Sequence, residues 1–408
     1  DPKKKKDSPS SSASRREAPS KKQIAKALEH NSKGLPARAL NAIDSVSNKL
    51  PNPMCPTKSE PVPCYTQLVK LHPHTEKIPD SAQKPNDIYQ HKTFSKELLF
   101  TKVRSTRNGT APGLSGMTEE LLFALIVDVR HGKILQERLR IICQHIAANE
   151  FPDSHPARES LTNCRLIALA KPRKLTDTFT TVRHIALAEA LLKLPARLLL
   201  DEHAAAIRTV FEQTNQFGVN YKGGAEKIIH ACRELLHVKN CVLVTIDAKN
   251  AFNTPDRDKI AKALRDEPAF APFRAMFDLE YRRHSNLFYM HKEGTNNIYS
   301  STGVRQGSTL SSLFYCAVTN PVLAKVLKKF PGVKVFAYMD DLTIAHPDAD
   351  VVIAVFCFIR EELEKLNILV NNSKCEAYCT AGFSTETLQK LRAVASPSDA
   401  NDHGIRPI

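Results

Sequence analysis

The sequence predicts an α+β fold in which an antiparallel sheet is backed by helices on one face. Residues 241–246 form a β-branched run that is typical of a buried strand, and residues 288–303 and 333–345 each have the pattern of a β-hairpin. Helical periodicity over 311–330 and 350–366 alternates with these hairpins. This order of strand, hairpin and helix suits a sheet whose helices gather on one side.

The 408-residue chain has a net charge of +15, which favours a polyanionic partner. Residues 1–22 hold eight basic and three acidic side chains, a balance of +5, so the other +10 belongs to the rest of the chain. Because this basic arm has almost no large apolar residue, we expect it to be disordered. Its four lysines at 3–6 suit a nuclear import signal or a nucleic-acid arm, and a solvated linker explains them equally well.

Residues 23–93 are expected to form an N-terminal extension. Helical spacing over 23–50 is interrupted by Gly34 and Pro36. The prolines that crowd residues 51–85 indicate an irregular strap lying over the surface.

Residues 94–240 combine helices with a pair of strands. A glycine-rich turn at 108–116 precedes the first helix, which Thr118 is expected to cap. Strand patterns occur at 165–169 and 182–187. Helical periodicity is found over four segments, namely 118–130, 133–148, 188–203 and 225–238.

Some classes of protein are excluded by composition. No apolar run approaches the ~20 residues that a bilayer-spanning helix needs, and no signal-peptide pattern is present, so we expect no membrane partner. The chain begins with Asp1 and is expected to be an excerpt of a longer protein. Its ten cysteines include no CxxC pair, which predicts reduced thiols and no zinc site.

Three carboxylates carry the main chemical signal. Asp340 and Asp341 lie side by side at the tip of the hairpin predicted over 333–345, and Asp247 ends the strand predicted over 241–246. A strand-terminal aspartate taken alone is more often a cap than a ligand, but its pairing with the other two favours a ligand. Carboxylates grouped in this way commonly hold two Mg²⁺ ions around a phosphate that is being transferred.

A second motif, residues 303–311, has two glycines that flank Arg305 and Gln306 and leads into a helix. Glycine lets the backbone approach a ligand closely, and a helix N-terminus favours phosphate. An ordinary turn into a helix has the same pattern, so this motif is weak when it is taken alone.

Together these motifs resemble a known family. Residues 247–252, 303–311 and 338–341, in this order, resemble the palm motifs of reverse transcriptases, most closely those of non-LTR retrotransposons and next those of group II introns. Two matches depart from the family's usual residues, with Ser115 in place of Asp and His184 in place of Pro. The remaining similar segments are 111–116, 165–172, 183–185, 216–218 and 366–374.

The resemblance implies an RNA-directed DNA polymerase with a right-hand fold. It implies helical and β fingers over 94–240 and an antiparallel-sheet palm with the catalytic carboxylates over 241–380. Residues 381–408 would begin the palm–thumb connection, with the thumb largely missing. Asp247, Asp340 and Asp341 would be both catalytic residues and ligands of two Mg²⁺ ions, with Mn²⁺ as a substitute.

The resemblance also assigns roles to residues around the carboxylates. An aromatic face at Phe252 would exclude a 2′-hydroxyl and so favour deoxynucleotides; ordinary core packing is the alternative. Lys374 would lie close to the leaving pyrophosphate. The implied nucleotide-binding residues are Lys171, Arg183, Phe252, Gln306, Gly307 and Lys374, and those implied to contact primer–template are Arg305, Tyr338 and Met339.

The partners implied are an RNA template, a DNA primer or target, and dNTPs, while the oligomeric state is not indicated. The nucleus is the expected compartment, with the cytoplasm as a second one. Two rival functions stay open at this point. One is a catalytically idle or truncated relic that only binds nucleic acid, and the other is a group II intron-type reverse transcriptase or maturase.

Overall fold

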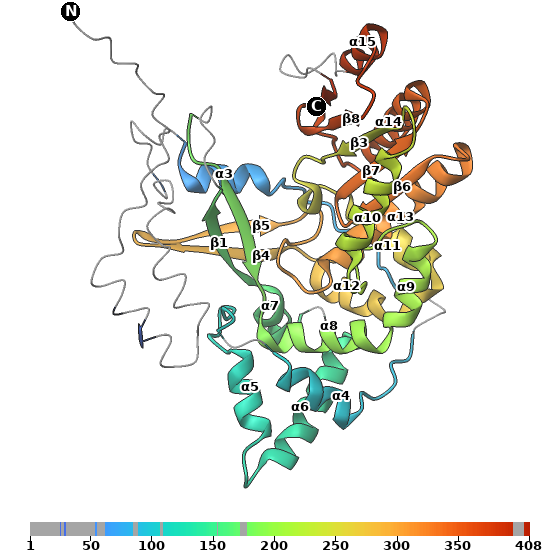
Figure 1. Ribbon diagram of the computed structural model, residues 1–408. Helices are drawn as coiled ribbons and strands as arrows, with labels where there is room; N and C mark the ends of the chain where they lie inside the picture. Colours follow the sequence, from blue (N-terminus) through green and yellow to red (C-terminus); the bar gives the residue numbers. More distant parts are fainter. Residues whose placement is uncertain are drawn as a thin grey trace, which may run out of the picture.

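The protein is described by a computed structural model (Figure 1). It describes residues 62–84, 89–106, 109–152, 154–171, 178–394 and 404–408, together with residues 25, 28, 29 and 54. The expected basic arm, nearly all of the helical stretch expected over 23–50, and residues 172–177 between two of the predicted strands lie outside the described residues. The predicted α+β class is confirmed, because helices and two separate sheets make up the described chain.

A five-stranded sheet is built around the strand that ends at Asp247. Its strands lie in the order β6-β7-β3-β8-β9. Strands β6, β7, β3 and β8 pair antiparallel, and β9 joins β8 in parallel. The bounds are β3 Val242–Ile246, β6 Lys334–Tyr338, β7 Asp341–His346, β8 Glu376–Cys379 and β9 Arg406–Pro407. The predicted strand and the predicted hairpin over 333–345 therefore do pair within one sheet.

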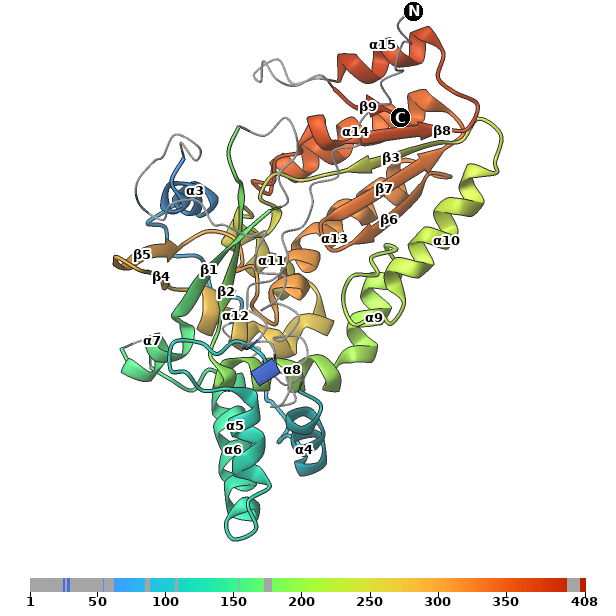
Figure 2. The ribbon, with the colours of Figure 1, turned by 60° about the vertical axis from the view of Figure 1, so that its left-hand side comes forward.

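Helices cover both faces of this sheet, whereas we predicted helices on one face only. On one face, α13 (Ser311–Lys329) and α14 (Ala349–Glu364) belong to the main core together with Val244. On the other face, α10 (Gly224–Leu236) packs over Leu243, and Figure 2 shows it beside the β6 edge. The sequence of β3 explains this difference. Its residues are almost continuously apolar, as is typical of a strand that is buried on both faces.

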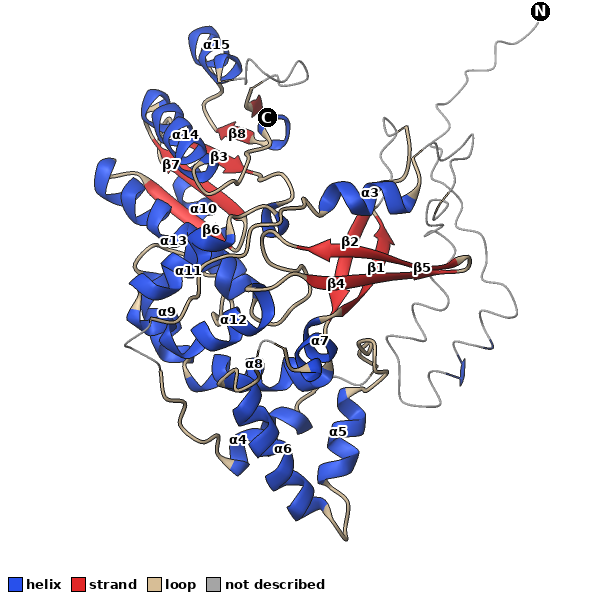
Figure 3. Cartoon of the chain, turned by 180° about the vertical axis from the view of Figure 1, so that it is seen from behind, coloured by secondary structure: helices blue, strands red, loops and turns tan. Residues whose placement is uncertain are grey.

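A four-stranded sheet, in the order β2-β1-β4-β5, forms the other β unit. Figure 3 shows it apart from the five-stranded sheet. Its strands are β1 Cys164–Ala170, β2 Val182–Leu187, β4 Ser285–His291 and β5 Gly294–Ser300. The hairpin predicted over 288–303 therefore belongs here, beside β1 in parallel, and not to the sheet of Asp247 as we predicted. Alternation in a sequence indicates which side chains are buried, but not which strand edge a hairpin joins.

The four predicted helical segments are confirmed with slightly different bounds, three of them as helices at the base of this second unit (α5, α6 and α8) and the fourth as α10 on the five-stranded sheet. Thr118 accepts a hydrogen bond from Leu121 N and caps the first of them, as predicted. Asp128 accepts from the backbone N–H groups of Arg130 and His131, so the helix predicted to reach 130 ends early. The helices are α4 Lys96–Arg104, α5 Glu119–Ile126, α6 Gly132–Ala147, α7 Pro156–Thr162, α8 Ala190–Glu202 and α9 Ala204–Glu212.

Outside these layers, shorter elements link the two units. The expected strap contains an unpredicted helix, α3 (Cys64–Leu71), before an extended segment. Among the described helices none is long and apolar enough to cross a membrane. The remaining elements are η1 Ala251–Asn253, α11 Arg257–Asp266, η2 Pro268–Phe273, α12 Arg274–Tyr281, η3 Asn372–Lys374 and α15 Thr385–Ala393.

Candidate active site

The three carboxylates predicted from the sequence gather at one end of the five-stranded sheet. Strand β3 pairs with β7 so that Ile246 lies opposite Leu342, which leaves Asp247 and Asp341 side by side at the ends of adjacent strands. Asp340 is in the turn between β6 and β7. Burial and the neighbouring carboxylates raise the pKa of Asp340, and burial and Asp247 raise that of Asp341. Negative charge is thus concentrated where a cation would relieve it.

The turn that carries Asp340 is fixed by Gln216. Met339 has a left-handed backbone with a φ of 56°, which is uncommon for a residue with a side chain. Met339 N donates to Gln216 Oε1 at 2.9 Å, and Gln216 Nε2 donates to Met339 O at 3.1 Å. Gln216 is 1% exposed, so water does not compete for these two hydrogen bonds.

Backbone contacts on either side of Gln216 align the same segment with β6. Phe217 N donates to Ala337 O at 2.8 Å, and Ala337 N donates to Asn215 O at 2.9 Å. A Cβ atom at Gly218 would overlap with Met339 N, so only glycine allows this close approach. The segment at 216–218, which the sequence matched to the family without a role, is therefore a support for the β6–β7 turn.

Lys374, which we expected close to the leaving pyrophosphate, lies beside Asp247. Its Nζ atom is 3.4 Å from Asp247 Oδ2, and its side chain is 61% exposed. Asn371 donates to the same oxygen at 3.2 Å and, through its backbone N–H, to Asp247 O at 2.8 Å. Asn371 was not predicted, and the only signal for it was its place in the family-like segment 366–374.

Two further predicted cations, Lys171 and Arg183, approach the carboxylates from the ends of β1 and β2. Burial, and the nearby charges of Lys374 and Arg183, lower the pKa of Lys171, while Asp247 acts in the opposite direction. Arg183 in turn opposes the rise in the pKa of Asp340. The structure therefore brings three cationic side chains, from the ends of β1 and β2 and from the 3-10 helix η3, toward the three carboxylates.

Phe252 provides an aromatic surface near the carboxylates. Its ring stacks on Tyr315 with centroids 5.0 Å apart and an angle of 22° between the planes. Tyr315 is buried, and burial together with Asp340 raises its pKa well above the usual range, so its hydroxyl stays protonated. Phe252 is half-buried and packs against the main core.

The loop with Gln306 and Gly307 packs against β2, the strand that carries Arg183. Ala186 N donates to Gln306 O at 2.8 Å. Gly307 has a φ of 110°, and a Cβ atom there would lie 2.7 Å from Ala186 O. Contact with strand β2 of the four-stranded sheet therefore requires glycine at this position, whether or not a ligand also approaches it.

Arg305 does not face a ligand, and the prediction that it contacts primer–template is wrong. It is 2% exposed, and its guanidinium forms an ion pair with buried Glu280 at 2.5 Å. It also donates to Thr162 O at 2.5 Å and to Ser285 Oγ at 3.0 Å. Arg305 instead joins the loop at 303–311 to α12 and to the start of β4. Sequence alone did not reveal this burial, because arginine in a loop is usually solvated.

The side chains at this site bear on the expectation of two magnesium ions. Within the described part of the chain, no group of three or more His, Cys, Asp or Glu side chains has an arrangement that could hold a metal ion. The available donors at the site are carboxylate oxygens, which suit a hard cation such as Mg²⁺. The pKa of Asp340 is raised by burial, Asp341 and Asp247, and that of Asp341 by burial and Asp247, which fits a cation there as well.

Tyr338 and several of the cysteines also lie within the described part of the chain. Tyr338 pairs with Asp341 across the β6–β7 hairpin, and its contact with a primer stays a prediction. Cys64, Cys143, Cys164, Cys241 and Cys316 are buried free cysteines.

Comparison with known proteins adds two findings. Residues 171–397 match the sequence profile of the family described as reverse transcriptase (RNA-dependent DNA polymerase). Over 283 residues the chain is 27% identical to the retrotransposable element SLACS 132 kDa protein of Trypanosoma brucei gambiense. That alignment covers 69% of this chain but 22% of the relative, so the chain spans about a fifth of the relative's length.

Proposed function

The chain belongs to the reverse transcriptase (RNA-dependent DNA polymerase) family, and on that premise we propose that it is the RNA-directed DNA polymerase of a non-LTR retrotransposon. The reaction is the transfer of a nucleotide from a dNTP to the 3′-hydroxyl of a primer. The similarity to a retrotransposable element protein supports the retrotransposon origin. The order of the motifs at 247–252, 303–311 and 338–341 supports the non-LTR type.

One observation carries the proposal. Asp247, Asp340 and Asp341 meet at the end of one sheet, and Lys171, Arg183 and Lys374 face them. A site with this charge pattern can hold cations on its acidic side and phosphate oxygens on its basic side.

Asp247 and Asp340 are the residues that would hold two Mg²⁺ ions, with Asp341 in support and Mn²⁺ as a substitute. When bound, such ions activate the attacking hydroxyl and neutralise charge on the transferred phosphate. Asn371 holds Asp247 Oδ2, and Gln216 holds the turn of Asp340, so both carboxylates are oriented before substrate arrives. That orientation lowers the reorganisation needed at the moment of reaction.

The cationic side chains bind the triphosphate. Arg183 can donate two parallel hydrogen bonds to phosphate oxygens, and Lys171 adds a point charge. Lys374, next to Asp247, offers charge or a proton to the leaving pyrophosphate. The Phe252 ring lies under the sugar, where it excludes a 2′-hydroxyl, and the stack on Tyr315 keeps it there. Gln306, Gly307, Tyr338 and Met339 complete the nucleotide and primer contacts.

An RNA template and a DNA primer or target are the proposed nucleic-acid partners, and the nucleus is the proposed compartment. A right-hand arrangement follows from this proposal, with fingers over 94–240 and a palm over 241–380. The net charge of +15 supports binding of a polyanion.

The rival of an idle, binding-only relic is disfavoured by the preserved carboxylates and by the supports of Gln216 and Asn371 beneath them. A group II intron-type enzyme has no specific observation in its favour.

The proposal is tested by extension of a DNA primer on an RNA template with dNTPs and Mg²⁺. We expect extension that stops on chelation of the metal and returns when Mg²⁺ or Mn²⁺ is restored. RNA binding without extension, at any metal concentration, would favour the binding-only relic.

A further inference from the structure

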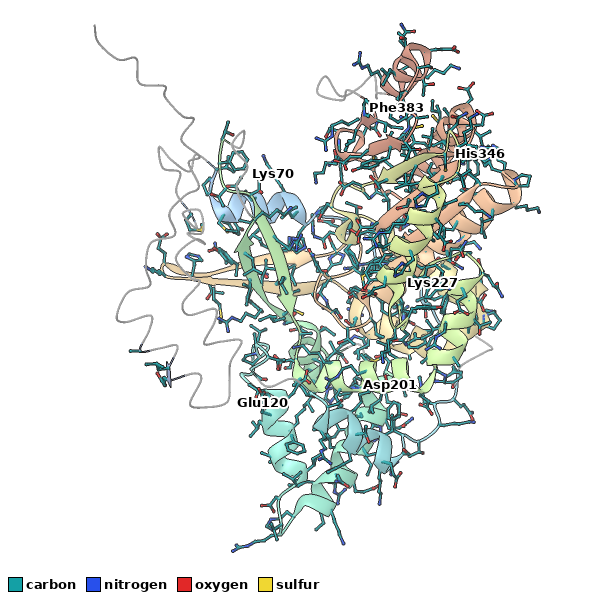
Figure 4. The ribbon with its side chains drawn as sticks, in the orientation of Figure 1. Lys70, Glu120, Asp201, Lys227, His346 and Phe383 are labelled. Carbon is teal, nitrogen blue, oxygen red and sulfur yellow. The ribbon has the colours of Figure 1, made fainter. Side chains whose placement is uncertain are left out.

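Helix α3, which precedes both sheets in the chain, is held against β2 by the side chain of Gln67. Gln67 Nε2 donates to Thr180 O at 2.9 Å, and Gln67 Oε1 accepts from Val182 N at 3.1 Å. Cys64 and Leu68 on the same helix are fully buried. Figure 4 shows α3, marked by Lys70, at the end of the four-stranded sheet. This helix is therefore an integral part of the unit that carries Arg183.

The last residue of α3 is joined to the loop of Phe252. Leu71 O accepts hydrogen bonds from Asn250 Nδ2 at 2.8 Å and from Asn253 Nδ2 at 2.6 Å. The second hydrogen of Asn253 Nδ2 points to His184 Nε2, 2.8 Å away. Asn253 and His184 are each 4% exposed, so this junction is dry.

His184 stands where the family usually has proline, and the structure explains why both residues fit. The backbone N–H groups of Val182 and Ala186 bond to Gln67 and Gln306 instead of to β1. By strand alternation the N–H of His184 also points away from β1, so proline would remove no ladder hydrogen bond there. In this chain the histidine at position 184 accepts a hydrogen bond from Asn253.

The Phe252 backbone is held from its other side by the loop at 303–304. Val304 N donates to Phe252 O at 2.7 Å, and the Thr302 hydroxyl lies 2.8 Å from Asn253 O. The Phe252 ring is stacked on Tyr315. Asn253, the next residue in the chain, connects Phe252 to α3 through Leu71 and to β2 through His184.

We propose that Asn253, seated on Leu71 and His184, is a positioning residue for Phe252, so that helix α3 governs discrimination between deoxyribose and ribose in the incoming nucleotide. The inference rests on the proposed polymerase function. A small shift of the ring is enough to admit one hydroxyl, because tightly packed sites respond to displacements well under an atomic diameter.

The test is single-nucleotide incorporation on an RNA template, with kcat/KM measured for a dNTP and for the matching rNTP. We expect Asn253→Ala to lower the preference for the dNTP about tenfold, equivalent to about 1.4 kcal/mol. Asn297→Ala, which removes an exposed asparagine from the β4–β5 hairpin, is the matched control and should keep the wild-type preference. The ratio is independent of the fraction of folded enzyme, because both substrates are measured on one preparation.

Gln67→Ala loosens α3 at a distance from Phe252 and should shift the preference in the same direction. If Asn253→Ala does not fold, His184→Leu removes the acceptor of Asn253 and is measured in the same way. An unchanged preference in folded, active variants, while Phe252→Ala lowers it, would overturn the inference. Absence of dNTP incorporation by the wild-type protein would instead contradict the proposed function.

Discussion

The side-chain amide of Gln216 is joined to the backbone of Met339 by two hydrogen bonds, at 2.9 and 3.1 Å. It thereby reaches, from 123 residues away, the turn that places Asp340 beside Asp247. A buried amide that satisfies both backbone groups of a left-handed residue fixes that turn, because a buried backbone group left without a hydrogen bond is costly.

We predict that Gln216→Ala lowers kcat for primer extension about ten- to a hundredfold, because misplaced catalytic groups cost rate. KM for the dNTP should change little, since the phosphate-binding cations are untouched. Gln213→Ala, an exposed glutamine three residues earlier, is the control. Wild-type kcat in a folded Gln216→Ala enzyme would show that the turn does not depend on this amide.

Lys374 is predicted to assist departure of the pyrophosphate. Lys374→Ala should lower kcat about tenfold or more, and Lys374→Arg should recover part of the loss because the charge is retained. Lys292→Ala, at the exposed tip of the β4–β5 hairpin, should be neutral. Steady-state extension at saturating dNTP provides the measurement, and equal kcat in all three variants would remove Lys374 from the mechanism.

Arg305 is predicted to act through stability instead of nucleic-acid contact. Arg305→Ala leaves Glu280 buried without its partner, so the free energy of unfolding should fall by about 3–5 kcal/mol. Urea unfolding of this variant beside Arg392→Ala, an exposed arginine on α15, measures the effect. Normal stability combined with weakened primer–template binding would restore the original interpretation of Arg305.

His184 is predicted to make stability depend on pH. Burial and the nearby His72 lower the pKa of His184 to about 4, from an ordinary value of 6.5. The unfolded chain therefore binds more protons between these values, and stability rises with pH up to about 6.5 and is lost progressively below it. The difference between the two pKa values corresponds to a loss of at most about 3 kcal/mol in the free energy of unfolding.

Between pH 7 and pH 4.5 the free energy of unfolding should thus fall more steeply for the wild type than for His184→Asn, whose side chain cannot titrate. His131→Asn, at an exposed histidine, should follow the wild type. Parallel curves for all three proteins would argue against a neutral, buried His184.

The sequence was sufficient for the α+β class, most helices and the three carboxylates. These features depend on local pattern, such as the β-branched run before Asp247 and the adjacent pair Asp340–Asp341. Phe252 and Lys374 were also named from the resemblance to the family's motifs, and the structure brings both near the carboxylates.

Long-range pairing could not be predicted from the sequence. The β4–β5 hairpin joins β1, more than a hundred residues upstream, and helix α10 covers the second face of the central sheet. Arg305 and Gln216 show the same limit at the level of side chains. Each has partners distant in the sequence, and no local pattern identifies a buried arginine or a glutamine that bonds to a remote turn.

Primer extension by an Asp340→Asn variant tests the central claim most directly. This change preserves the shape of the side chain and removes its charge. On an RNA template with dNTPs and Mg²⁺, the wild type and the control Asp266→Asn, an exposed position on α11, should extend the primer. Asp340→Asn should lose about a hundredfold or more of the rate while it still binds RNA. Extension by Asp340→Asn at the wild-type rate would contradict the account.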